Sequence, residues 1–339
     1  MSAGRRLLVL LVAVALLAGA GTLAVLHAAE RARGGRTSGV PVVSGPVSLG
    51  AGAGGPRLVF RTMAWGAQRD RLAAVPLAHP DAVRTVADGP SCLRFHAAAG
   101  TGICLQAVPG LVQDGYRAVV LDAALHEVRH YDLAGIPTRA RVSPSGRLVA
   151  WTVFLSGDSY AGTSFSTRTS VLDTRTWTLQ ENLEDDALTV DGAPYRAPDV
   201  NVWGVTFADD DRFYATVATG GRTYLAAGGV AGRTLTTLHG NVECPSLSPD
   251  GTRVAYKKRV PGLPEDAPWR LYVLDLRTMA ESATAERRDV DDQALWLDDG
   301  TLAYALPGDD GTDLWSVPAD GSGAPALLVR AALAAAVVH

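Results

Sequence analysis

Residues 246 to 256 read SLSPDGTRVAY: a short extended stretch, a tight polar turn and a second extended stretch. In the turn, Pro249 fixes its own φ, Asp250 follows, and Gly251 tolerates the positive φ that sends the chain back antiparallel. The stretch therefore predicts a β-hairpin, with an alternating strand, a tight polar turn and a second strand.

Three other stretches have the same shape. They are RVSPSGRLVAW at 141–151, VTFADDDRFYA at 205–215 and LWLDDGTLAY at 295–304. A second shared piece, Val-Leu-Asp, occurs at 120–122, 171–173 and 273–275, and at the last two positions an Arg-Thr turn and another extended stretch follow. Two hairpins per unit give four strands, and four-stranded units of about 40 to 50 residues are typical of β-propeller blades.

This strand–Ser-Pro-Asp-Gly–strand pattern resembles the TolB-like (WD-type) β-propeller family. Residues 248–251 match the signature fully, residues 143–146 differ at Ser145, and residues 297–300 keep only its end. The resemblance covers residues 57–329 and implies an all-β, six-bladed propeller with blades starting near 57, 91, 139, 201, 243 and 291. It also implies a scaffold or interaction role at the cell envelope.

The letters HEVRH at 126–130 match the zinc-protease motif. His126 and His130 can share one zinc ion only on a helix, because on a strand they lie roughly 13 Å apart. When the Val-Leu-Asp pieces are aligned, His126 falls on Trp177, in the outer fourth strand of a blade. We interpret the motif as a chance match, and we expect no metal site and no cofactor.

The N-terminus carries twenty uncharged, mostly apolar residues, Leu7 to Leu26, directly after Arg5 and Arg6. Twenty helical residues span a hydrocarbon core of about 30 Å. We favour a transmembrane anchor at 7–26 with a cytoplasmic segment at 1–6, although a cleaved signal peptide fits the same residues. The domain is then extracytoplasmic on a single-pass cell-membrane protein, or secreted if the segment is cleaved.

The regions flanking the expected propeller lack a clear pattern. Residues 27–56 are rich in Gly, Ser and Pro and read as a flexible linker, whose apolar part at 40–47 can be recruited as an edge strand. Residues 330–339, mostly Ala and Val, are assigned to a C-terminal tail, and the sequence does not indicate their place in the fold.

The chain has three cysteines. Cys92 and Cys104 lie on either side of a turn-like Ala-Gly-Thr-Gly stretch, so in an oxidising compartment they can form a disulfide. The alternative is that both are small buried hydrophobic residues. Cys244 is left over and is expected to be a buried thiol.

Composition and motifs exclude several classes of function. The 339 residues carry a net charge of −4, so no basic excess indicates a nucleic-acid partner. The GDSYAG stretch at 157–162 is one residue too long for a hydrolase nucleophile elbow. The acidic groups at 209–211, 298–299 and 309–310 lack the spacing of a calcium loop and are expected to be turn residues.

The candidate binding site follows from propeller geometry. The first strands of all blades line the central channel, and the segments leading into them form one mouth. The expected mouth residues are Arg139, Arg141, Tyr195, Asn201, Trp203, Asn241, Glu243, Asp291 and Asp292. We therefore expect a non-enzymatic, membrane-tethered propeller that binds an envelope protein, a peptide or a polar ligand at this mouth. The alternative is a hydrolase, cyclotransferase or lyase with its active site there.

Overall fold

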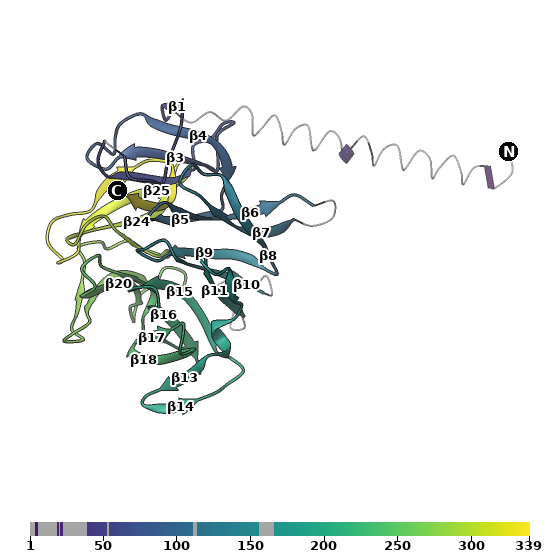
Figure 1. Ribbon diagram of the computed structural model, residues 1–339. Coiled ribbons are helices and arrows are strands. Elements are labelled where there is room, and N and C mark those ends of the chain that lie inside the picture. Colours follow the sequence, from purple (N-terminus) through teal and green to yellow (C-terminus); the bar gives the residue numbers. More distant parts are fainter. Residues whose placement is uncertain are drawn as a thin grey trace.

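The computed structural model describes residues 39–52, 54–110, 114–155 and 166–339, together with Gly4, Arg5, Gly19, Gly21 and Thr22. The described residues form six β-sheets and one short 3₁₀ helix, η1 (Leu183–Asp185). The sheets succeed one another around a ring in chain order, from the purple start to the yellow end of Figure 1. The expected all-β, six-bladed propeller is confirmed.

Each sheet is one blade, and the strands of each blade are named below in order from the innermost, beside the channel, to the outermost. The first blade contains β27 (Ala332–Val338), β2 (Arg57–Thr62), β3 (Arg71–Pro76), β4 (Arg84–Ser91) and β1 (Val42–Ser44), and the second contains β5 (Arg94–Ala98), β6 (Thr101–Val108), β7 (Gly115–Leu121) and β8 (Glu127–Leu133). The third blade contains β9 (Ile136–Val142), β10 (Leu148–Phe154), β11 (Thr167–Asp173) and β12 (Thr178–Gln180), and the fourth contains β15 (Asn201–Phe207), β16 (Arg212–Thr219), β17 (Arg222–Gly229), β18 (Thr234–Gly240), β13 (Ala187–Val190) and β14 (Ala193–Tyr195). The fifth blade contains β19 (Glu243–Leu247), β20 (Arg253–Arg259), β21 (Trp269–Asp275) and β22 (Glu281–Ala283), and the sixth contains β23 (Leu295–Trp296), β24 (Thr301–Gly308), β25 (Gly311–Pro318) and β26 (Ala326–Val329).

The ring is closed by the C-terminal strand. Residues 330–339, expected to be a tail outside the propeller, instead supply β27, which pairs antiparallel with β2 as the innermost strand of the first blade. The yellow end of the chain accordingly lies beside the blue N-terminal strands in Figure 1. Because the first blade takes strands from both ends of the chain, the domain extends beyond the expected limits of 57 and 329.

Apolar cores between neighbouring blades hold the ring together. Each adjacent pair of blades, including the first and sixth, shares its own cluster of buried side chains. Strand β10 is buried at all seven positions, because a middle strand of a blade packs against the blades on both sides. This explains why its sequence, LVAWTVF, is almost continuously apolar rather than alternating.

The Ser-Pro-x-Gly turns owe their form to local hydrogen bonds. In the fifth blade the Ser248 hydroxyl accepts a bond from the backbone N–H of Arg253 at 2.9 Å, and the Gly251 N–H donates to the Ser248 carbonyl at 2.9 Å. Gly251 has φ of 71°, as the sequence predicts. In the third blade Ser143 and Gly146 repeat these contacts.

The HEVRH stretch is not helical. Its last four residues begin the outer strand β8, and His130 Nδ1 lies 2.6 Å from Glu127 Oε1 on the surface. The interpretation of the motif as a strand coincidence is confirmed, since the helix that would bring both histidines to one zinc ion is absent from this described segment.

The N-terminal region is described only in part. Almost all of the apolar segment at 7–26 lies outside the described residues, and among the residues that are described no helix is long and apolar enough to span a membrane. Within the segment expected to be a linker, β1 joins the edge of the first blade, parallel to β4. Val47 and Leu49 are buried, so this part of residues 27–56 belongs to the folded domain.

The cysteines fall into two groups. Cys92, just before β5, and Cys104 on β6 are joined by a disulfide in the second blade, which is one of the two readings considered above. Cys244, on the inner strand β19, is a buried free thiol.

Candidate functional site

The channel mouth is the end of the propeller at which the inner strands begin. Two neighbouring inner strands, β5 and β9, each direct alternate residues toward the axis, since side chains at i and i+2 share a face of a strand. Arg94 and Arg139 form an outer layer, and His96 and Arg141 form a second layer one step deeper. The strand β19 and the segment preceding β23 complete both layers from the other side.

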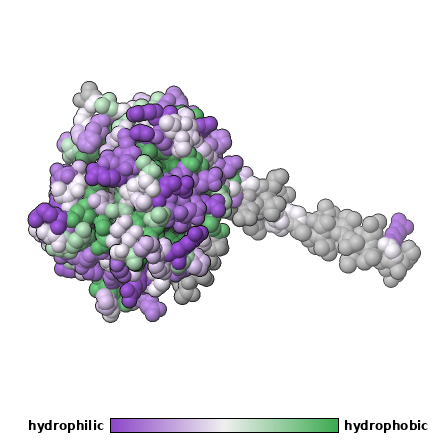
Figure 2. All heavy atoms as spheres, turned by 60° about the horizontal axis from the view of Figure 1, so that its bottom comes forward, coloured by the Kyte–Doolittle hydropathy of each residue, from purple (hydrophilic) through white to green (hydrophobic). Residues whose placement is uncertain are grey.

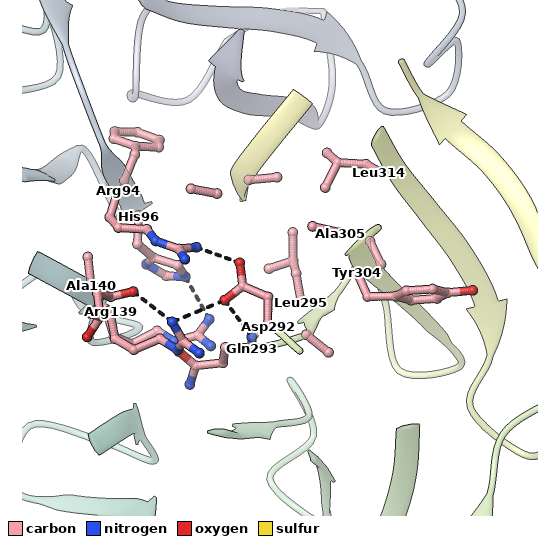
Figure 3. Close-up of a pocket in the computed structure, with 17 residues that line it drawn as sticks. Arg94, His96, Arg139, Ala140, Asp292, Gln293, Leu295, Tyr304, Ala305 and Leu314 are labelled. Carbon is pink, nitrogen blue, oxygen red and sulfur yellow. Dashed lines mark hydrogen bonds and ion pairs between the residues drawn. The ribbon is translucent and has the colours of Figure 1, made fainter. Parts of the chain in front are cut away.

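The outer layer is an ion-pair network around Asp292. Its carboxylate pairs with the Arg94 guanidinium and lies 3.5 Å from Arg139 Nη1. Figure 3 shows Arg94 and Arg139 directed at Asp292 from two sides. Burial alone would raise the pKa of Asp292, but the positive charges of Arg94 and Arg139 outweigh it and lower the pKa to about 2.

Arg139 also ties the outer layer to Cys244. Its Nε and Nη2 lie 3.4 and 3.3 Å from the Cys244 sulfur, and its Nη1 donates to the Thr138 carbonyl at 2.9 Å. Gln293, which precedes the inner strand of the sixth blade, donates from Nε2 to the backbone carbonyl of Pro245 in the neighbouring fifth blade at 2.6 Å. These bonds connect the third, fifth and sixth blades around the axis.

In the second layer, Arg141 Nη1 lies 3.0 Å from His96 Nε2, and Arg141 Nη2 lies 3.5 Å from Ser246 Oγ. Burial lowers the pKa of His96 well below its usual value, and the positive charge of Arg141 acts in the same direction. The imidazole is therefore neutral at physiological pH.

A separate cluster in the fifth blade surrounds Lys257, whose side chain is fully buried. Its ammonium lies 3.4 Å from Glu243 Oε2, pairs with Asp291, and sits 4.0 Å from the centre of the Trp269 ring. Trp269 in turn donates its indole N–H to Glu243 at 3.4 Å. Glu243 and Lys257 face each other in the ladder between β19 and β20.

A small cavity of about 50 Å³ lies beside the two layers. Its polar wall is formed by the arginines, His96, Asp292 and Gln293, and the opposite side is apolar. Figure 3 places Ala305, Tyr304 and Leu314 on that other side. The volume suits roughly three to five water molecules, at about 10–15 Å³ each, so the axis admits a small chemical group rather than a whole peptide.

Five of the nine expected mouth residues meet in these two clusters: Arg139, Arg141, Glu243, Asp291 and Asp292. Trp203 lies on the inner strand β15 and is 2% exposed, so it belongs to the packed interior of the fourth blade.

The remaining three expected residues make structural hydrogen bonds outside the two clusters. Tyr195 sits on β14, where its hydroxyl lies 3.0 Å from Thr219 Oγ1. Asn201 accepts the backbone N–H of Thr167 at 2.7 Å and so links the third and fourth blades. Asn241 brackets the backbone of Arg259, accepting its N–H at 3.1 Å and donating to its carbonyl at 2.9 Å.

Four charged or polar residues of the site were not among those expected: Arg94, His96, Lys257 and Gln293. Arg94 starts the inner strand of the second blade just as Glu243 starts that of the fifth, but the first two blades match the repeat poorly. Lys257 lies opposite Glu243 in the β19–β20 hairpin. The position of the SPDG turn fixes which residues of this hairpin face each other, so it could have predicted Lys257 from Glu243.

The structure also places the acidic groups that were considered as calcium ligands, and it contains a second hollow. The carboxylates of Asp209 and Asp298 accept backbone N–H groups within their own turns, as expected for turn residues. The stretch at 157–162 lies outside the described residues. A second and larger hollow, of about 320 Å³, lies away from the axis beside β6 and β7, where Gln106, Arg117 and Glu127 rim an apolar floor.

Comparisons with known proteins identify the fold. No protein-family model matches the sequence, and no curated protein matches it. Among solved structures, TolB from Acinetobacter baumannii aligns with a TM-score of 0.57 at 15% identity, over 84% of this chain and 66% of that one.

Two solved enzymes align with TM-scores below 0.5. A puromycin-hydrolyzing peptidase from Mycobacterium tuberculosis gives 0.46 at 16% identity, over 81% of this chain and 43% of that one. An oligogalacturonate lyase from Vibrio parahaemolyticus gives 0.45 at 9% identity, over 74% and 72%. The chain spans about two thirds of the length of the TolB structure and less than half of the peptidase. It is a six-bladed β-propeller of the TolB-like fold.

Proposed function

We propose that the chain is a non-enzymatic binding module, tethered to the cell membrane by its N-terminal segment, that takes an envelope protein, peptide or other polar ligand at the channel mouth. The observation that carries this proposal is the pairing of the charged groups at the mouth. Arg94 and Arg139 both pair with Asp292, and Lys257 is held between two carboxylates.

Such pairing suits recognition better than proton transfer. A general acid or base works best with a pKa near the working pH. The pKa of Asp292 is about 2 and that of His96 lies well below its usual value, so both groups keep one protonation state at neutral pH. The mouth therefore presents a fixed pattern of charge, which favours orientation and selection of a partner.

The tether is a proposal from the sequence. The uncharged run at 7–26 is long enough to span a bilayer, and it is followed by a Gly/Ser/Pro-rich stretch before β1. A disulfide between Cys92 and Cys104 suits an oxidising compartment outside the cytoplasm.

The alternative function is an enzyme with its active site at the mouth. One observation favours it: the Cys244 thiol, a potential nucleophile, lies at the mouth and receives two guanidinium N–H groups from Arg139. Against it, Cys244 is 0% exposed, so a substrate has no access to the sulfur in this conformation.

The test is affinity capture from detergent-solubilised envelope with the soluble domain as bait. Trp203 and Arg139 are too deeply buried for alanine variants to report on binding alone. Asp291→Ala and Arg259→Ala change side chains on the exposed rim of the mouth, and Arg175→Ala changes an exposed residue at the opposite end of the third blade.

We expect partners that bind wild type and Arg175→Ala but are lost from both rim variants. Partners retained equally by all four proteins would contradict binding at the mouth. The variant Cys244→Ser separates the two functions, since it should keep every partner of the binding module and would abolish turnover by a thiol enzyme.

A further inference from the structure

Arg141 is a buried cation without a carboxylate partner among the described residues. The residue is 8% exposed, and its contacts are the imidazole of His96 and the hydroxyl of Ser246, both neutral. Its Nε is buried and has no acceptor within the described part of the chain. Asp292, the carboxylate whose charge acts on Arg141, is already engaged by Arg94 and Arg139.

The charges around the axis consequently do not balance. The two clusters contain four cations, namely Arg94, Arg139, Arg141 and Lys257, and three carboxylates, namely Glu243, Asp291 and Asp292. Burial lowers the pKa of Arg141 to about 10, which still leaves it charged at neutral pH. A buried charge without a counter-charge is costly, so the site has the character of a receptor for one negative charge.

Hydrogen-bond donors are also in surplus. The backbone N–H of Val142 points at His96 Nδ1 at 3.1 Å, and Arg141 Nη1 meets His96 Nε2 at 3.0 Å. A neutral imidazole has one N–H and one acceptor nitrogen. If Nδ1 accepts from Val142, then Nε2 carries the proton and faces the Arg141 N–H. Two donors then face each other, and each needs an acceptor from a bound ligand.

The cavity beside these groups is of the right size. Its volume of about 50 Å³ accommodates a group of three heavy atoms, and Arg141, His96 and Arg94 all line it. We propose that this axial cavity binds a small monovalent oxyanion of the carboxylate class, held by the guanidinium of Arg141 and the imidazole N–H of His96. The inference goes beyond the proposed function, because binding of a free anion requires no protein partner.

Formate is the probe, since it is the smallest carboxylate. The melting temperature of the whole protein is measured while sodium formate replaces sodium isethionate, a bulkier monovalent anion, at constant ionic strength and pH 7.5. We expect a saturable rise on the order of a few degrees, because a ligand that binds only the folded state stabilises it. The rise should be retained in Arg175→Met and lost in Arg141→Met.

A second measurement does not depend on a variant folding. Line broadening of ¹³C-formate in the presence of wild type should reveal exchange with a single saturable site. No broadening and no rise in melting temperature with wild type would overturn the proposal, as would a rise that persists in Arg141→Met. Chloride acting as strongly as formate would overturn the assignment to carboxylates.

Two sources of the carboxylate are separated by peptides. Trialanine with a free C-terminus is compared with its C-terminal amide as a competitor of ¹³C-formate. Competition by the acid alone assigns the site to the terminal carboxylate of a peptide, while formate binding without such competition assigns it to a free small anion. Competition by the amide as effective as that by the acid would refute recognition of negative charge.

Discussion

Glu184 should make the stability of the propeller depend on pH between about 4.5 and 7. It belongs to η1, between the third and fourth blades, where Oε1 accepts from the Thr167 hydroxyl at 2.8 Å and from the Val202 N–H at 3.2 Å. Oε2 accepts from the Thr169 N–H at 3.1 Å. Burial raises the pKa of Glu184 from 4.5 to about 7, although these hydrogen bonds act in the opposite direction.

The sign follows from proton binding. Below pH 4.5 the carboxyl is protonated in both the folded and the unfolded chain, and its contribution to stability is fully present. As pH rises toward 7 the unfolded chain releases the proton first, so the free energy of unfolding falls. A shift from 4.5 to about 7 corresponds to about 3 kcal/mol, at about 1.4 kcal/mol per pKa unit.

The perturbation is Glu184→Gln, which keeps the shape of the side chain but cannot ionise. Free energies of unfolding are measured by urea denaturation from pH 4.5 to 7.5 for wild type and the variant. We expect the variant to gain about 3 kcal/mol relative to wild type across this range. Glu181→Gln removes an exposed carboxyl from the same segment and should follow the wild-type profile. A difference between wild type and Glu184→Gln that is constant with pH would refute the reasoning.

Three further predictions concern the supports of the fold. Lys257→Met should lower the free energy of unfolding by about 3–5 kcal/mol in urea denaturation, because two carboxylates lose their buried partner; an unchanged midpoint would show that the cluster contributes nothing. Replacing Cys92 and Cys104 with serine should cost about 3 kcal/mol, as expected for a short closed loop, and should abolish the sensitivity of the melting temperature to dithiothreitol. A chain ending at Val329 lacks β27 and should lose about 5 kcal/mol or more of apolar burial, seen as early melting and rapid proteolysis; full resistance would contradict closure by this strand.

The sequence predicts the local parts of this fold well because hairpin turns are local. The SPDG and SPSG turns fix two blades by their own chemistry, and strands begin within a few residues of the expected blade boundaries. The pairing of β27 with β2 joins the two ends of the chain. No turn residue marks such a pairing, so an Ala/Val-rich segment could not be placed from its letters alone.

The candidate site was likewise predictable only where it depends on the repeat. The repeat locates the inner strands, and this predicts the axial positions of Arg139, Arg141, Glu243 and Asp292. Tyr195 does not reach the axis, because β13 and β14 form an additional hairpin that attaches to the outer edge of the fourth blade beside β18. That attachment is made through a parallel pairing that the repeat pattern does not encode.

Site-directed photo-crosslinking in native membranes tests most directly whether the channel mouth is the binding surface. A benzoylphenylalanine residue replaces Ile136, which is exposed at the start of β9 beside the mouth, in one protein, and Arg175 at the opposite end of the propeller in another. We predict a discrete crosslinked adduct from position 136, which an excess of soluble wild-type domain suppresses, and none from position 175. An adduct formed only at position 175, or at neither position, would contradict binding at the mouth.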